Sequence, residues 1–251
     1  MSNKNRLHPP IRIGTLIFFV LLCLVSTDSI KAQVWKSTTN TPEARYGHSM
    51  VTLPDGRVVV FGGQGENDTL FNDTNIFRDT WTLVKPENDP PPARAFHNAW
   101  VQGEKMYIYG GMGGTNFWYD DLWSYDTSSN IWTKYYPDGK IPEAREKASA
   151  FSKHSDLYIL GGQGITGELN DIWYYNIEEN SWKKWGHFPV GVAGASTFVY
   201  QQNLFVFCDF SRMMAVDLFT KVWREIQPAP APGPRVLAAS SQNSNSGYLL
   251  G

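Results

Sequence analysis

The feature that most constrains the fold of this chain is an internal repeat of about fifty residues. Its landmarks follow a fixed order, which is complete in the second and third repeats: an arginine behind a proline-containing segment, an apolar run that ends in a glycine pair, an acidic residue two positions before a tryptophan, and a second tryptophan. In the first repeat the segment 64–78 is longer, and its third strand is not registered by this pattern. A chain with such a period forms one supersecondary unit per repeat and buries its core by packing the units together.

The arginines and the glycine pairs set the register of the repeat. The first three arginines are 49 and 51 residues apart, and Val192 stands where the next one would be. The repeat arginines are Arg45, Arg94, Arg145 and Arg235. Glycine pairs end the runs 58–63, 106–111 and 157–162, whereas the corresponding run 204–209 ends in Cys-Asp. A glycine pair at a strand end indicates positive φ or the close approach of a neighbouring backbone.

The apolar pattern within one repeat predicts a four-stranded antiparallel sheet. In the second repeat, turn residues separate four short apolar or alternating runs, 96–101, 105–110, 121–125 and 131–135. Such a sheet has two apolar faces, so its aromatic residues must pack against the next unit. Radial stacking of the units, as in a propeller, meets this requirement.

Together these landmarks resemble the kelch repeat. The resemblance is carried by Arg-x-x-His at the first strand, Gly-Gly after the second, Asp-x-Trp-x-Tyr-Asp on the third (121–126) and Trp on the fourth. It covers residues 34–251 and is weakest in the fourth repeat, where Val192 replaces the arginine and 212–214 replaces Asp-x-Trp. It implies an all-β fold, a kelch-type β-propeller of four-stranded antiparallel blades, with about four complete blades and a partial fifth.

The repeat also predicts the domain organisation. A propeller domain is expected over residues 33–251, with 34–36 as a strand that closes the last blade. The expected blades lie near 45–93, 94–144, 145–191 and 192–234, and the partial fifth at 235–251. Because the sequence stops at the first glycine of a fifth glycine pair, we expect a longer propeller of about six or seven blades.

Residues 1–32 have the three parts of a secretory signal peptide. Basic residues at the start precede an apolar run of thirteen residues, 13–25, and the small residue Ala32 stands at the cleavage position. A membrane-spanning helix needs about 20 apolar residues, so this run is short for one. The leader predicts a secreted or cell-surface protein, and an uncleaved anchor is the alternative.

Two further features bear on an exported chain. Two Asn-x-Thr sequons, at Asn67 and Asn72, lie in a polar stretch, and in a eukaryotic source they predict glycosylation of an exposed loop. Cleavage of the leader would leave Cys208 as the one cysteine, so no internal disulfide can form. Stability must therefore come from packing.

The charge balance argues against two classes of partner. Removing the leader takes away four basic residues and one acidic residue, which leaves 18 basic and 23 acidic residues and a net charge of −5. Nucleic acids and anionic membranes attract clustered Lys and Arg, and no such cluster remains. We expect no nucleic-acid partner, and a membrane contact only through an uncleaved anchor or a missing C-terminal segment.

No catalytic or metal-binding constellation stands out. A resemblance to galactose oxidase would require a copper site with two Tyr, two His and a Cys crosslinked to one Tyr. His48 and His97 occupy one repeat position, so repeat scaffolding explains them without a metal. We expect no catalytic residue, no metal and no cofactor. The alternative is a secreted propeller enzyme, such as a sugar oxidase or sialic-acid epimerase, with active residues in missing blades.

The candidate binding residues fall into two groups. By symmetry, Arg45, Arg94, Arg145 and Arg235 are expected to ring the central channel, where they would hold an acidic side chain or a carboxylated sugar. The alternative is that each arginine pairs with an acidic residue of a neighbouring blade.

The second group is the aromatic run Phe117, Trp118 and Tyr119, together with Phe71. These residues lie in loops between second and third strands, where kelch-like propellers bind partners and where exposed aromatic residues anchor them. The alternative is packing against an adjacent blade. The resulting prediction is an exported, non-catalytic module that binds a protein or a glycan.

Overall fold

The structure is a computed structural model that describes residues 40–208, 212–226, 239–242 and 247–250. The leader, the expected closing strand at 34–36 and Arg235 lie outside the described residues. Within the described part the fold is all-β, with one short 3-10 turn, η1 (Glu66–Asp68), and no α-helix. None of the described helical segments is long and apolar enough to cross a membrane.

The described strands form four four-stranded antiparallel sheets, as the repeat predicts. The first blade contains β1 (Ser49–Thr52), β2 (Val58–Phe61), β3 (Thr74–Phe77) and β4 (Trp81–Val84). The second contains β5 (Asn98–Gln102), β6 (Lys105–Tyr109), β9 (Leu122–Asp126) and β10 (Ile131–Tyr135). The third contains β11 (Ser149–Lys153), β12 (Asp156–Leu160), β15 (Asp171–Asn176) and β16 (Ser181–His187). The fourth contains β17 (Ser196–Tyr200), β18 (Asn203–Phe207), β19 (Met213–Asp217) and β20 (Trp223–Ile226).

Three two-stranded ribbons complete the described strands. They are β7 (Met112–Gly114) with β8 (Phe117–Trp118), β13 (Gln163–Gly164) with β14 (Gly167–Glu168), and β21 (Ala239–Gln242) with β22 (Gly247–Leu250). The last ribbon lies beside β17, where the partial fifth blade is expected.

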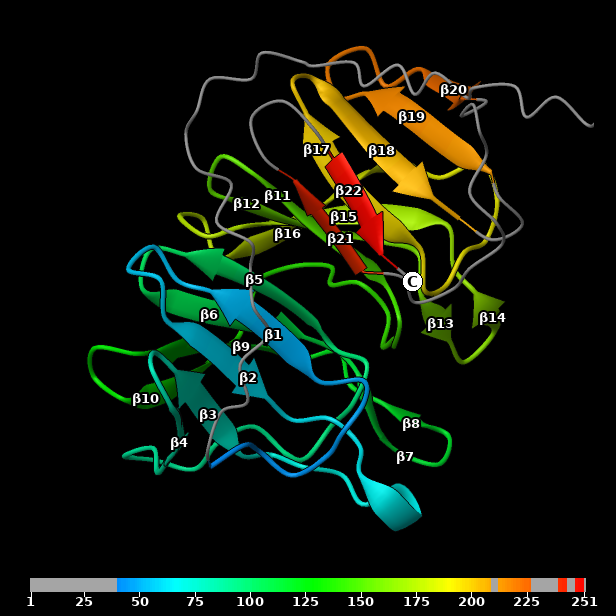
Figure 1. The fold of residues 1–251 in the computed structure, drawn as a ribbon. Coiled ribbons are helices and arrows are strands. Elements are labelled where there is room, and N and C mark those ends of the chain that lie inside the picture. The colour runs from blue at the N-terminus through cyan, green and yellow to red at the C-terminus, as the bar shows by residue number, and fades with distance from the viewer. Residues whose placement is uncertain (1–39, 209–211, 227–238, 243–246, 251) are drawn as a thin grey trace, which may run out of the picture. The chain divides into compact units, whose positions relative to one another are not determined.

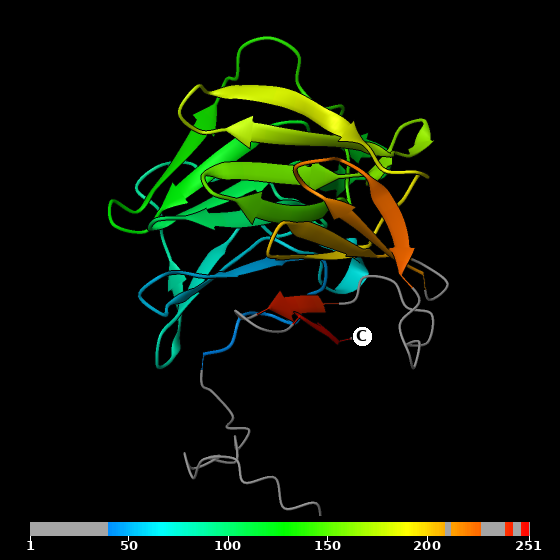
Figure 2. The ribbon, with the colours of Figure 1, turned by 90° about the horizontal axis from the view of Figure 1, so that it is seen from above.

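The blades are arranged as in a β-propeller. The first strands of successive blades, β1, β5, β11 and β17, are neighbours in space, so they form the inner part of the arrangement (Figure 1). Viewed from above, the sheets follow one another in chain order from the blue first blade to the orange fourth blade (Figure 2). Each blade thus turns one face toward the blade before it and one toward the blade after it.

Aromatic residues fill the space between the blades. The fourth-strand residue Trp132 packs on Phe61 of the preceding blade, with ring centroids 4.6 Å apart, and its indole N–H donates to Thr74 Oγ1 at 3.2 Å. In the next interface Trp182 packs on Tyr109 at 4.9 Å. Burying rings of this size contributes roughly 2–3 kcal/mol each, which explains how the blades cohere without disulfides.

The glycine pairs are required for both expected reasons. Gly161 has φ +62°, and a Cβ at this position would lie 2.3 Å from the carbonyl oxygen of Val192 in the next blade. The N–H of Gly162 donates to that same oxygen at 2.7 Å. The glycine pair therefore admits a backbone hydrogen bond between consecutive blades.

Replacing Gly161 with Ala tests this account. We expect Gly161→Ala to lower the free energy of unfolding by about 3 kcal/mol or more, because the added Cβ collides with backbone in addition to straining φ. Gly139→Ala is the matched control, since Gly139 has φ +80° and nothing within 4 Å of a Cβ. It should lose only about 1–2 kcal/mol. Equal losses in urea titrations of the two variants would contradict the collision.

Candidate partner-binding face

Each repeat arginine in the described residues is clamped within its own blade. Arg94, which is fully buried, donates from Nε to the Pro92 carbonyl oxygen at 3.0 Å and from Nη1 to the Gly110 carbonyl oxygen at 3.0 Å. Nη1 and Nη2 also donate to the two carboxylate oxygens of Asp121 at 2.6 and 3.1 Å. This bidentate geometry is the strongest form of a charged hydrogen bond.

The first and third blades repeat the clamp. Arg145 pairs with Asp171 at 2.6 and 2.9 Å, and Arg45 pairs with Asp73 at 2.5 and 2.9 Å. In each blade the arginine also donates to the carbonyl oxygen of the first glycine of the pair. The acid thus comes from the arginine's own blade, whereas the sequence suggested either a ligand or an acid of a neighbouring blade. In these three blades the guanidinium groups are committed to the scaffold.

Asp73 identifies a third strand that the sequence left unregistered. The first repeat lacks Asp-x-Trp, but its arginine and aspartate are 28 residues apart, close to the 27 and 26 residues of the next two repeats. In the second and third blades the aspartate also accepts from the indole N–H of the following Trp, and in the first blade Asn75 donates instead. The arginine-to-aspartate spacing was the signal that would have found β3.

The clamp shifts the pKa of the buried carboxyl groups. Burial by itself raises the pKa of Asp121, but the hydrogen bonds and positive charge of Arg94 outweigh it, and the pKa is lowered. Asp171 behaves in the same way with Arg145. A carboxyl group whose pKa is lower in the folded state stabilises the fold above its unfolded pKa of about 4 and loses that contribution as pH falls.

Asp121→Asn tests the clamp. Breaking a buried ion pair by removing one partner should lower the free energy of unfolding by about 3 kcal/mol at about pH 7, because Arg94 is left without a counter-charge. The difference from wild type should shrink at about pH 3, where the carboxyl group of the wild type is itself being protonated. Urea titrations at both pH values measure this. The exposed neighbour Asp120, changed to Asn, is the control and should move little.

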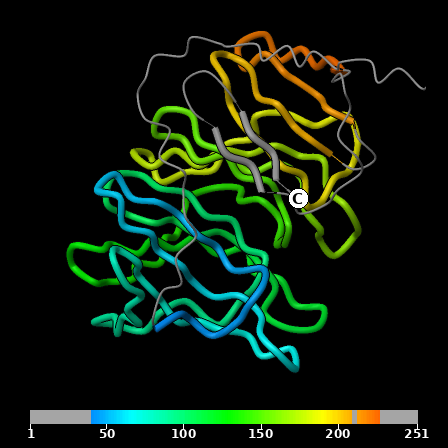
Figure 3. The backbone as a smooth tube through the Cα atoms, in the orientation of Figure 1, coloured from blue at the N-terminus to red at the C-terminus, as the bar shows by residue number. Residues whose placement is uncertain are grey.

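Loops between second and third strands project from one side of the blades, seen at the right of Figures 1 and 3. We call this side, with the blade connections beside it, the loop face; it comprises residues 46–47, 62–73, 95–96, 110–121, 146–147 and 161–171. The β7–β8 ribbon and its counterpart β13–β14 lie here. Phe117 is 53% exposed at the ribbon tip, and Trp118 is half-buried.

Tyr119 occupies a position that all three described loops share. Its N–H donates to Gly111, as that of Phe71 does to Gly63 and that of Leu169 to Gly162. The guanidinium carbon of Arg94 lies 3.9 Å from the ring centroid of Tyr119, and that of Arg45 lies 4.1 Å from the ring of Phe71. This placement gives Tyr119 and Phe71 bracing contacts with the repeat arginines. Phe117 packs edge-on against the Tyr119 ring, with ring centroids 4.9 Å apart, and is itself mostly exposed.

A chain of backbone hydrogen bonds joins the blades at the loop face. The N–H of Phe96 donates to Gly47 at 2.6 Å, that of Lys147 to Phe96 at 2.9 Å, and that of Gly194 to Lys147 at 2.7 Å. All four residues have φ between +53° and +69°. Two glycines adopt this conformation without strain, but Phe96 and Lys147 do not.

The residue before each of the first three of these positions is held by a second repeated pairing. Tyr46, Ala95 and Glu146 each form an antiparallel bridge with the residue after the glycine pair, which is Gln64, Met112 and Gln163 in turn. The backbone is thus the same in three blades while the side chain changes from Tyr to Ala to Glu. Phe96, Glu146 and Lys147 are not among the residues predicted from the sequence, although the variation at fixed repeat positions marked them.

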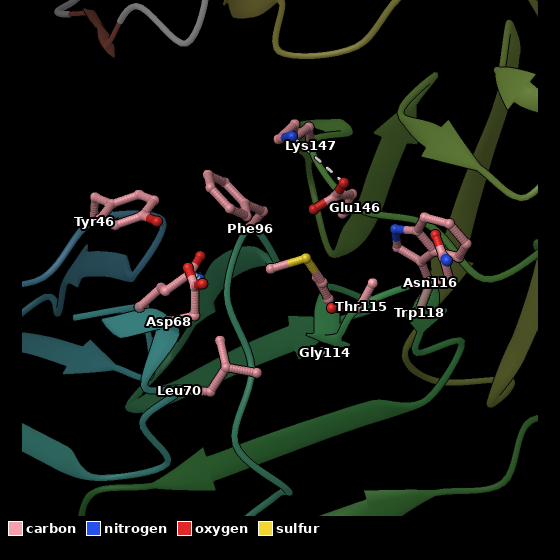
Figure 4. A pocket seen from close by; sticks show the side chains of 12 residues that line it. Tyr46, Asp68, Leu70, Phe96, Gly114, Thr115, Asn116, Trp118, Glu146 and Lys147 are labelled. Atoms are coloured by element: carbon pink, nitrogen blue, oxygen red, sulfur yellow. Dashed lines mark hydrogen bonds and ion pairs between the residues drawn. The ribbon is translucent and has the colours of Figure 1, made fainter. Parts of the chain in front are cut away.

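These side chains enclose a pocket of about 540 Å³ between the first three blades (Figure 4). Its lining residues come from the blade connections and from the loops of the first two blades. They are Tyr46, Gln64, Asp68, Leu70, Phe96, Met112, Gly114, Thr115, Asn116, Trp118, Glu146 and Lys147. The pocket combines an exposed ring, Tyr46, and the half-buried rings of Phe96 and Trp118 with side chains of both charges, which suits a polar ligand that also has apolar groups.

The remaining predicted residues are placed as follows. Asn67 and Asn72 are both exposed on the first-blade loop, but Thr74 of the second sequon is buried as the acceptor for Trp132. His97 is buried, its Nε2 lies 2.6 Å from Ser49 Oγ, and burial lowers its pKa. No group of three His, Cys, Asp or Glu side chains in the described ranges is arranged to hold a metal ion.

Comparisons with known proteins agree with the repeat. The family model described as KLHDC2/KLHL20/DRC7 Kelch-repeats domain matches residues 17–208 and 76–251. Kelch domain-containing protein 3 of Homo sapiens is 31% identical over 160 residues, which are 57% of this chain and 41% of the relative. Tip elongation aberrant protein 1 of Schizosaccharomyces pombe is 34% identical over 177 residues, 67% of this chain and 15% of the relative.

A further relative covers more of the chain. The Leucine-zipper-like transcriptional regulator 1 homolog of Drosophila melanogaster is 28% identical over 210 residues, 74% of this chain and 21% of the relative. The chain therefore spans less than half the length of each of these relatives.

Proposed function

Because the chain belongs to the kelch-repeat family, we propose that it is an exported, non-catalytic interaction module that binds a partner protein on its loop face. The observation that carries the proposal is the pocket of about 540 Å³ on that face. Its walls are side chains that vary at fixed repeat positions, while the clamped arginines and the backbone bridges already satisfy the scaffold. Side chains that the fold does not require are available for a partner.

Phe117 and Trp118 are the aromatic anchors in this proposal. They stand at the ribbon positions that Gly167 and Glu168 occupy in the third blade, so the blade core does not need them. Large rings at the rim of a pocket supply contact area at a low cost in side-chain entropy. Tyr119, beneath Arg94, supports the loop that carries them.

The proposal is tested with peptides selected from a random-sequence display library on the immobilised wild-type chain. We expect Trp118→Ala to lower the affinity for the selected peptides by about tenfold or more. The free energy of unfolding of this variant should fall by less than about 1 kcal/mol. Phe219→Ala is the control, because Phe219 is 86% exposed in the β19–β20 turn at the opposite end of the blades. Fluorescence anisotropy measures both affinities.

Failure to select any peptide, or equal losses in the two variants, would contradict a protein-binding loop face. A glycan array probed in parallel covers the carbohydrate partner. Binding of glycans alone, lost in Trp118→Ala, would replace the protein partner with a glycan on the same face.

Export is proposed from the composition of the leader. We expect a reporter protein fused behind residues 1–40 to leave a secretory host, and mass spectrometry to find Gln33 as the mature N-terminus. Leu21→Arg interrupts the apolar run and should retain the reporter in the cell. A reporter that stays inside the cell with the wild-type leader would contradict export. A reporter that reaches the cell surface but keeps the leader and stays in the membrane would indicate the uncleaved anchor.

A further inference from the structure

We propose that the pocket on the loop face takes the basic side chain of an extended peptide, with Glu146 as the carboxylate that receives it. The inference rests on the proposed protein-binding function and names the chemistry of the partner. Its basis is the unpaired polar atoms, the charges and the backbone strain of the pocket.

Glu146 presents an unpaired carboxylate oxygen. The residue is only 6% exposed, and its Oε1 lies 3.4 Å from the Lys147 ammonium. Oε2 is buried and has no hydrogen-bond partner among the residues that the structure describes. In Figure 4 this oxygen points away from Lys147, toward the Phe96 side of the pocket. A buried oxygen left without a donor is costly to the fold, and a hydrogen-bond donor from a ligand would recover that cost.

The charges of the pocket favour a cation. Asp68 and Glu146 carry negative charges and Lys147 one positive charge, so the lining has one negative charge in excess. Asp68 accepts a hydrogen bond from Gln64 Nε2 at 2.8 Å, which holds its carboxylate at the wall formed by the first blade. A ligand with an ammonium or guanidinium group would balance this charge, whereas an acidic ligand would add to it.

Lys147 already shows where a cation fits. Its ammonium lies 4.7 Å from the ring centroid of Phe96 as well as close to Glu146. A ring face beside a carboxylate is a favourable setting for a cation. Because Lys147 engages only Oε1, the second oxygen is left for a guanidinium from a partner.

The backbone conformation of Phe96 and Lys147 is costly to the fold. At this repeat position the first and fourth repeats have glycine, whereas the left-handed conformation is unfavourable for a residue with a side chain. Strain of this kind is retained where a side chain has a function. Both side chains line the pocket, so ligand contact is the function that the geometry offers.

Trp118 defines the rest of the ligand. Its indole Nε1 is buried without an acceptor among the described residues, and in Figure 4 it lies on the side of the ring that faces Glu146. The pocket thus offers one donor and one acceptor. A basic side chain on a peptide whose backbone carbonyl accepts from Trp118 satisfies both, which a free amine would not.

The test uses the selected peptides and full-length chain. Among the peptides that bind Trp118→Ala less tightly than wild type, we expect an Arg or Lys at one fixed position. Replacing that peptide residue with Gln should lower the affinity for the wild-type chain by about tenfold. Glu146→Gln should weaken the basic peptide by a similar factor and leave its Gln version unchanged. Glu178→Gln is the control, since it removes the same charge from an exposed turn at the other end of the blade.

Lys147→Gly provides a second arm. It installs the residue of the first and fourth repeats and removes the resident ammonium, so the basic peptide should bind about threefold more tightly. The peptide-side substitution leaves the protein intact, so the test holds even if a variant fails to fold, which thermal melting reports.

The outcomes separate the inference from the function on which it rests. Peptides that depend on Trp118 but lack a basic residue, or that bind Glu146→Gln as well as wild type, overturn the cation site and leave protein binding in place. Enrichment of acidic peptides, or weaker binding to Lys147→Gly, also overturns it. Failure to select any peptide removes the proposed function itself.

Discussion

A buried arginine that pairs with an aspartate of its own blade fixes the geometry of each of the first three blades. The guanidinium group ties the segment before the first strand to the glycine pair after the second and to the start of the third, as Arg94 does with Gly110 and Asp121. An unpaired charge at this depth would be strongly destabilising, so the three segments must come together as one unit. The conserved spacing within the repeat follows from this contact.

The clamp also links one blade to the next. The carbonyl oxygen of Arg94 accepts from Gly63 in the preceding blade, and that of Arg145 accepts from Gly111. The fourth repeat separates the two roles, because Val192 keeps the backbone bond, here from Gly162, while its own side chain is buried among apolar residues. The contact between blades therefore needs the glycine and the backbone, and the arginine side chain serves its own blade.

Because backbone groups carry the repeat, its side chains at the loop face are free to differ. The bridge that holds Tyr46 also holds Ala95 and Glu146, so a carboxylate, a methyl group and a phenol ring occupy equivalent sites. Among the described residues, Glu146 and Trp118 each present one buried polar atom without a hydrogen-bond partner at this face. Repeat proteins use such variable side chains on a regular backbone to build their binding surfaces.

The sequence by itself determined the all-β class, the four-stranded blades and the glycine pairs, because these depend on spacing and on alternation of apolar residues along the chain. Only the tertiary structure decided that the arginines are paired within their own blades, that Tyr119 braces Arg94, and that Glu146 and Lys147 meet Phe96. These contacts depend on which atoms become buried together when the segments of the chain pack. They join residues that are far apart in the sequence, so no local sequence pattern predicts them.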